Sequence, residues 1–127
     1  PWADLTISGD SIKERAQRDP VFTAMTMERW QQVSQDYYGD HDPSSPLISP
    51  ALADLQGLPP MLITVGSEEQ LYSDAERVVN NAKAANIDVE FIIGDDLTHV
   101  WQLQYLFLPE ARQSIQQIGD YVRTKTS

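Results

Sequence analysis

Two short apolar runs separated by one amphipathic segment restrict this chain to an α/β fold. Residues 61–65 and 89–93 are mostly apolar and rich in β-branched side chains, which is typical of parallel strands covered on both faces. Between them, apolar residues recur at helical spacing from Ala75 to Ala82, which predicts a helix with one buried face. The sequence therefore predicts a βαβ unit whose two strands lie parallel in one sheet.

The ends of this central helix are predicted from capping residues. Ser73 and Glu76 have the spacing of a capping box, with Ser73 as the N-cap residue. Asp74 then occupies the first helical position, where a negative charge favours the helix dipole. Asn86 is suited to the left-handed conformation that often ends a helix.

Two more helices are predicted before the βαβ unit, over residues 11–18 and from about 26 to 38. Ser11 and Thr26 are the expected N-cap residues, and Gly39 is suited to end the second helix. The apolar stripe of the second helix consists of Met27, Trp30, Val33 and Tyr37.

A last helix is predicted from Pro109 to about residue 123, because proline is favoured at the first helical position. Its apolar stripe, which we expect to face the core, consists of Ala111, Ile115, Ile118 and Val122. Two strands leave an open sheet edge, and the chain starts abruptly on Pro1. We therefore expect it to be part of a longer protein, or to pair with another copy of itself to complete the sheet.

The composition limits the possible partners. The formal net charge of −10 repels phosphate backbones, so we expect no nucleic-acid binding. No apolar run approaches the roughly 18 residues that a membrane span needs. The chain has no cysteine, which excludes disulfides, thiolate nucleophiles and cysteine-ligated zinc, and a cytoplasmic location is the default expectation.

Ionisable residues follow both predicted strands. Glu68 and Glu69 come after the first strand, and Asp95, Asp96 and His99 come after the second. The carboxyl ends of parallel strands meet at one edge of a sheet, where α/β proteins place their reactive residues. A carboxylate beside an imidazole could serve in a catalytic triad. The spacing alone equally allows a packing histidine with solvated carboxylates.

The residues around these positions resemble a known family. Segment 57–74 begins Gly-Leu-Pro-Pro, continues through the first strand and ends in Gly-Ser-Glu-Glu-Gln-Leu-Tyr-Ser-Asp, which is similar to a signature of the hormone-sensitive-lipase-like α/β-hydrolases. Segment 96–101, Asp-Leu-Thr-His-Val-Trp, resembles the loop that carries the catalytic histidine of these carboxylesterases and lipases. The resemblance implies that Glu69 is the acid and His99 the histidine of a Ser-His-acid triad.

The same resemblance implies how the chain is divided and what it binds. Residues 1–8 correspond to the segment after a core strand, residues 9–42 to a helical cap that shapes the acyl pocket, and residues 43–127 to the C-terminal βαβα part of the hydrolase core. The substrate implied is a small-molecule ester, and no cofactor is implied.

The family's nucleophile motif, Gly-Asp-Ser-Ala-Gly, and its His-Gly-Gly oxyanion segment do not occur in this sequence. Gly9-Asp10-Ser11 begins like the nucleophile motif, but Ile12 and Lys13 follow where a small residue and a glycine are required. We therefore expect the chain alone to be inactive.

Two other classes of function compete with this hypothesis. A non-catalytic module that pairs with another chain is compatible with the open sheet edge. A flavodoxin-like binding domain is disfavoured, because the acidic loop 65–69 would repel phosphate. We expect no metal site at Asp40-His41-Asp42, since three consecutive side chains rarely converge on one ion. Asp74 is an alternative to Glu69 as the acid of the triad, and it is the less favoured of the two.

Overall fold

The computed structural model describes residues 1–126. Its centre is the predicted βαβ unit, which consists of strand β1 (Met61–Gly66), helix α3 (Tyr72–Ala84) and strand β2 (Val89–Gly94). The two strands are paired in parallel along their whole length. The α/β fold class and both predicted strands are therefore confirmed. Asn86 has a φ of 58° just after α3, as expected for a residue that ends a helix.

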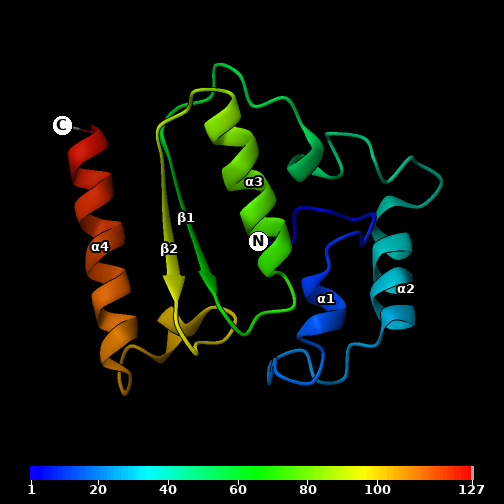
Figure 1. The fold of residues 1–127 in the computed structure, drawn as a ribbon, viewed down its shortest axis with the longest axis horizontal. Coiled ribbons are helices and arrows are strands. Elements are labelled where there is room, and N and C mark those ends of the chain that lie inside the picture. Colours follow the sequence, from blue (N-terminus) through cyan, green and yellow to red (C-terminus); the bar gives the residue numbers. More distant parts are fainter. Residues whose placement is uncertain (127) are drawn as a thin grey trace.

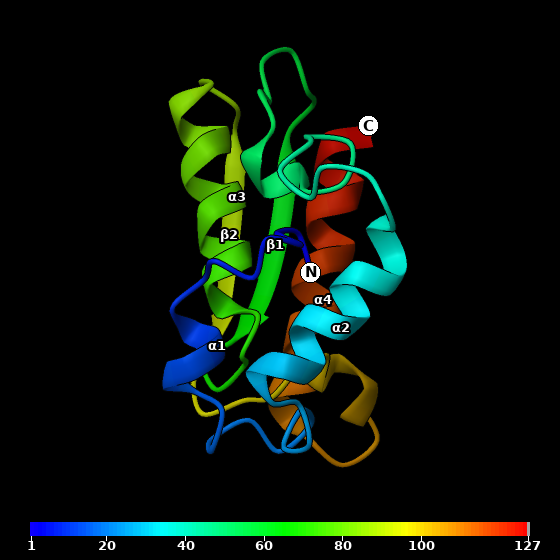
Figure 2. The ribbon, with the colours of Figure 1, turned by 90° about the vertical axis from the view of Figure 1, so that its right-hand side faces the viewer.

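Helices α3 and α4 (Pro109–Thr126) lie on opposite sides of the two strands (Figures 1 and 2). The buried face of α3 includes Ala75, Val79 and Ala82, which lie at the helical spacing predicted for it. In the part of the chain that the structure describes, the sheet has two strands. Each strand therefore keeps one backbone edge without a partner strand, as expected for an incomplete sheet.

Helix α4 begins at Pro109 as predicted, but its predicted buried stripe is only partly right. Ala111 is buried, whereas Ile115 and Val122 are 44% and 50% exposed. The main contact of α4 is with the short 3-10 helix Trp101–Gln104, near its own N-terminal end. Beyond Ala111, the residues of the stripe are exposed or only partly buried.

Helices α1 (Ser11–Glu14) and α2 (Met27–Tyr38) lie on the α3 side of the molecule, away from α4 (Figure 1). Helix α2 matches its prediction: Thr26 Oγ1 accepts a hydrogen bond from the Arg29 N–H at 3.2 Å, and Gly39 follows with a φ of 57°. Helix α1 is one turn long, shorter than predicted, and turns continue to residue 18.

The core on this side of the molecule surrounds Trp30 of α2. Trp30 is buried with Ile12 and Leu71, and partly buried apolar residues pack against this cluster. Tyr37, which the sequence pattern placed on the same stripe, is 70% exposed and does not belong to this cluster.

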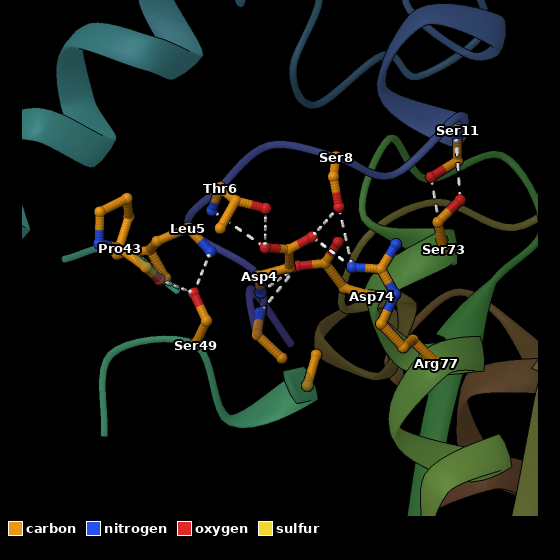
Figure 3. Close-up of polar contacts among 12 residues, drawn as sticks. Asp4, Leu5, Thr6, Ser8, Ser11, Pro43, Ser49, Ser73, Asp74 and Arg77 are labelled. Atoms are coloured by element: carbon orange, nitrogen blue, oxygen red, sulfur yellow. Dashed lines mark hydrogen bonds and ion pairs between the residues drawn. The ribbon is translucent and has the colours of Figure 1, made fainter. Parts of the chain in front are cut away.

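The predicted N-cap roles of Ser11 and Ser73 are wrong. Helix α1 starts at Ser11 itself, and α3 starts at Tyr72 with Leu71 as its N-cap residue. Ser73 Oγ accepts a hydrogen bond from the Ser11 N–H at 3.0 Å, and Ser11 Oγ accepts one from the Ser73 N–H at 2.9 Å (Figure 3). These two hydroxyls cap each other's helix, so a contact between helices replaces the local capping box with Glu76.

Residues 39–60 form the irregular connection that their composition predicted, apart from one 3-10 turn at Pro50–Leu52. None of the helices described within residues 1–126 is long and apolar enough to cross a membrane.

Candidate active site

The loops that follow β1 and β2 lie together at one end of the molecule, where the arrowheads of both strands point in Figure 1. The Ser67 N–H donates to the Gly94 carbonyl at 2.9 Å, and the Glu68 N–H donates to the Leu97 carbonyl at 3.2 Å. Backbone hydrogen bonds therefore hold the loop after β1 against the loop after β2.

Glu69 and His99 are joined by a hydrogen bond across these two loops. His99 Nδ1 lies 2.8 Å from Glu69 Oε2, so the proximity expected from the strand order is present. Glu69 is 2% exposed, and its Oε1 accepts the Gly66 N–H at 2.6 Å. An ionised carboxylate only accepts hydrogen bonds, so we infer that Nδ1 carries the hydrogen and that Nε2 keeps a lone pair.

Gly66 allows the two loops to approach each other closely. A Cβ atom built at this position would lie 2.3 Å from the Leu97 carbonyl oxygen and 2.7 Å from that of Thr98. Both distances are too short for any real side chain. The residue that ends β1 must therefore be glycine if the histidine loop is to lie within reach of Glu69.

A cavity of about 380 Å³ opens beside this pair. Its lining consists of Pro1, Leu62, Ile63, Thr64, Glu69, His99, Val100, Trp101 and Gln102. The His99 side chain is 27% exposed, whereas that of Glu69 is 3% exposed. The imidazole is therefore accessible from a largely apolar hollow, while the acid is shielded behind it.

The other acidic residues of the two loops do not share this arrangement. Glu68 forms an ion pair with the exposed Arg18 at 2.5 Å, and the hydrogen bond from Arg18 lowers the pKa of Glu68. Asp95 and Asp96 are exposed, and Asp96 has a φ of 56°, which is typical of a turn. Among the described carboxylates, Glu69 is the one hydrogen-bonded to His99.

Asp74, the alternative acid, lies in a separate buried cluster. It is the third residue of α3, so the prediction that it occupies the first helical position is wrong. Its Oδ2 accepts the N–H groups of Ala3 and Asp4, each at 2.8 Å (Figure 3). Burial raises the pKa of Asp74 to about 6, despite these hydrogen bonds and with the nearby Asp4 adding to the rise.

The neighbouring Asp4 is also fully buried but is better compensated. Burial alone would raise its pKa, but hydrogen bonds from the Ser8 and Thr6 hydroxyls and the charge of Arg77 outweigh burial and lower it. Arg77 of α3 forms an ion pair with Asp4 (Figure 3). The cluster attaches the N-terminal segment of the chain to α3.

One aromatic neighbour of His99 was not identified from the sequence. Trp101 is buried and lines the same cavity. The ring paired with the His99 imidazole belongs to Phe22, with 5.1 Å between the ring centroids. Phe22 lies 77 positions earlier in the sequence, and no local pattern marks such a contact.

Within residues 1–126 there is no group of three or more histidine, aspartate or glutamate side chains that could hold a metal ion. At Asp40-His41-Asp42, all three residues are exposed. The Asp42 carboxylate accepts hydrogen bonds from the N–H and the hydroxyl of Ser44, which is the geometry of a surface turn.

Comparisons with known proteins give consistent results for both sequence and structure. The family model described as the α/β-hydrolase fold matches residues 1–103. An acetyl-hydrolase from Streptomyces hygroscopicus is 40% identical over 126 residues, which cover 99% of this chain and 41% of that protein. An esterase from Acinetobacter venetianus is 31% identical over 122 residues, which cover 95% of this chain and 39% of that protein.

Solved structures with the same fold are similar over nearly the whole chain. The crystal structure of an esterase from the bacterial hormone-sensitive lipase family matches with a TM-score of 0.91 and 40% identity, covering 100% of this chain and 42% of that one. A hormone-sensitive lipase from a metagenome library matches with a TM-score of 0.89 and 42% identity, covering 98% of this chain and 42% of that one. The chain spans about two-fifths of the length of these relatives.

Proposed function

The chain belongs to the α/β-hydrolases of the hormone-sensitive lipase family, and from this membership we propose that it supplies the acid and the histidine of a Ser-His-acid triad to a carboxylic-ester hydrolase. The observation that carries the proposal is the 2.8 Å hydrogen bond between His99 Nδ1 and the buried carboxylate of Glu69. The serine nucleophile and the oxyanion hole come from protein outside this chain.

In the proposed reaction, His99 Nε2 accepts the proton of the serine hydroxyl while the serine oxygen attacks the ester carbonyl. The imidazolium then gives this proton to the leaving alcohol as the carbon–oxygen bond of the ester breaks. Water hydrolyses the acyl-enzyme by the same proton transfers in a second round. Glu69 holds the Nδ1–H tautomer and stabilises the imidazolium. Because Glu69 is buried, water screens little of its attraction for the positive charge of the imidazolium.

The names of the relatives support ester hydrolysis as the reaction class. They include an acetyl-hydrolase and an esterase, and the crystals of a further structural relative, EstE5, were soaked with p-nitrophenyl butyrate. We propose a small-molecule ester as the substrate here. We also propose that residues 1–8 follow a core strand, residues 9–42 belong to a cap and residues 43–127 form the C-terminal part of the hydrolase core.

The free edge of β1 is where the remainder of the sheet would pair. The cavity beside Glu69 and His99 is lined by three β1 residues, Leu62, Ile63 and Thr64, so strands added at this edge would bring their own carboxyl ends toward His99. We therefore propose that the serine nucleophile approaches His99 from the side of this free edge of β1.

A chimera tests this proposal. The part of the Streptomyces acetyl-hydrolase that the chain does not match is joined to residues 1–127, and hydrolysis of p-nitrophenyl acetate is measured. We expect activity in the chimera, a loss of about 10⁶-fold in kcat for His99→Ala, and no activity sensitive to serine inhibitors in the chain alone.

His41→Ala is the matched control for the chimera, because His41 is the only other histidine within residues 1–127 and is exposed. It should leave kcat unchanged. Activity of the chimera that survives His99→Ala would contradict the proposed function.

A further inference from the structure

Phe22 links His99 to the aromatic core around α2. Its ring lies 5.1 Å from the His99 ring with an interplanar angle of 48°, and 5.2 Å from the Trp30 ring in an edge-to-face arrangement. Trp30 is 2% exposed. The imidazole therefore packs against a side chain that is itself supported by a buried neighbour.

Asp19 fixes the backbone that carries Phe22. Its side chain is fully buried, and its Oδ1 accepts the N–H groups of Val21 at 2.9 Å and Phe22 at 3.2 Å. Its other oxygen, Oδ2, accepts the N–H of Gln70 at 2.8 Å. Gln70 directly follows Glu69, so one carboxylate joins the Phe22 segment to the loop of the acid.

Gln70 makes this connection a second time with its buried side chain. Its Nε2 donates to the Phe22 carbonyl at 2.9 Å, and its Oε1 accepts the Trp30 Nε1–H at 2.8 Å. These two hydrogen bonds, and the one from the Gln70 N–H to Asp19, each join residues 40 or more positions apart in the sequence. The loop after β1 is thus bound to the segment before α2 through both its backbone and a side chain.

We propose that Phe22 and Asp19 are positioning residues for the Glu69–His99 pair. Asp19 sets the distance between the acid loop and the Phe22 segment, and Phe22 holds the imidazole in the orientation that points Nδ1 at Glu69. The catalytic meaning of this role rests on the proposed function. The geometric claim concerns His99 in this chain and can be measured without any activity.

The physical argument is one of restricted rotation. The His99 side chain is 27% exposed and lines an open cavity, so on that side few atoms hinder rotation about its side-chain bonds. One hydrogen bond fixes Nδ1, and an aromatic ring against the imidazole limits the remaining freedom. Removing the ring leaves the hydrogen bond to resist rotation alone.

Nuclear magnetic resonance of the 127-residue chain labelled at its histidines tests the inference. In the unsubstituted chain we expect a downfield Nδ1–H signal from His99 that is lost in Glu69→Ala. In Phe22→Leu, which keeps apolar volume but removes the ring, the His99 ring protons should move toward the resonances of the exposed His41. Exchange of the Nδ1–H with solvent should become about tenfold faster. Phe22→Tyr should restore both properties.

Asp19→Asn tests the second residue, because an amide has one acceptor oxygen where Asp19 uses two. It should also speed the exchange of the His99 proton. Asp10→Asn is the matched control: it removes the same charge from an exposed residue of the same segment, and it should change neither signal.

The outcomes separate this inference from the proposed function. If the Glu69-dependent signal is present but Phe22→Leu and Asp19→Asn leave it unchanged, the positioning role is overturned and the triad proposal stands. If the unsubstituted chain has no Glu69-dependent signal, the positioning role is overturned, and the chimera alone decides the triad proposal. Should Asp19→Asn unfold the chain, Phe22→Leu decides alone, because Phe22 is only partly buried.

Discussion

Glu69 and Asp74 lie five positions apart in the sequence and are 2% and 1% exposed, but their carboxylates have different partners. Asp74 accepts two backbone N–H groups from the N-terminal segment. Glu69 accepts one backbone N–H and is hydrogen-bonded to the His99 imidazole, a group that can itself bind and release a proton.

This difference underlies our proposal that Glu69, and not Asp74, is the catalytic acid. Both carboxylates are buried, and burial raises the pKa of Asp74 to about 6. Asp74 holds two segments of the chain together and has no hydrogen bond to His99 in the described structure. A perturbed carboxyl group is therefore a weak marker unless its partner can take part in proton transfer. Substitutions at Glu69 and at Asp74, compared with each other, test this difference between the two carboxylates.

The largest effect is expected on activity in the chimera described above. Glu69→Ala removes the partner of His99 and should lower kcat by about 10³- to 10⁴-fold. Asp74→Asn, which keeps an oxygen for the N–H groups of Ala3 and Asp4, should lower it by less than about tenfold. Assays with p-nitrophenyl acetate at saturating substrate compare the two variants. Equal losses in both would remove the functional difference between the two carboxylates.

The sequence predicted these two sites to different extents, because their contacts join residues at different separations along the chain. The strand order predicted that the loops carrying Glu69 and His99 lie together, because they follow adjacent parallel strands. The choice of Glu69 among the acidic residues of these loops came from the family resemblance. The Ser73–Glu76 capping box was wrong because the Ser73 hydroxyl binds the N–H of Ser11, 62 residues away. A local motif does not reveal a competing distant partner.

The same reason explains the residues that were missed. Asp19, Phe22 and Gln70 reach the site through contacts with no sequence periodicity, and the Asp74 contact with the N-terminal segment spans 70 residues or more. In α4, the apolar spacing correctly predicted a helix, but Ile115 and Val122 are exposed. Periodicity identifies the face of a helix that can be covered, whereas the elements that cover it depend on the whole sheet.

A smaller effect is expected on stability, and it should depend on pH. The folded pKa of Asp74 is about 6, above its unfolded value of about 3.9, so between these values the folded chain binds more protons than the unfolded chain. Its contribution to stability is therefore full below about pH 4 and is lost as the pH rises through 6. From pH 4.5 to 6.5 the free energy of unfolding should fall by about 2 kcal/mol more in the unsubstituted chain than in Asp74→Asn.

Urea unfolding of the 127-residue chain and of Asp74→Asn at both pH values measures this difference. Identical pH dependence in the two proteins would contradict a raised pKa at Asp74. Asp4 is present in both proteins, and its lowered pKa moves its titration away from this range.

The smallest effect is expected for Glu68, the surface carboxylate next to Glu69 in the loop after β1. Its ion pair with Arg18 is at the surface, with the Arg18 side chain 58% exposed. Arg18→Ala should therefore change the free energy of unfolding by less than about 1 kcal/mol, measured by urea unfolding at pH 7. A change as large as that expected for Asp74 would mean that surface charge contributes as much to this end of the sheet as buried charge.

The close approach at Gly66 affects which sequences this fold can accept. Gly66 has no functional group, touches no substrate in the proposed reaction and is neither acid nor base. Any other residue there would collide with the carbonyl oxygens of Leu97 and Thr98 and push the histidine loop away from Glu69. In a library of random substitutions, position 66 should be as intolerant as position 99, and inspection of the reaction chemistry alone would not identify it.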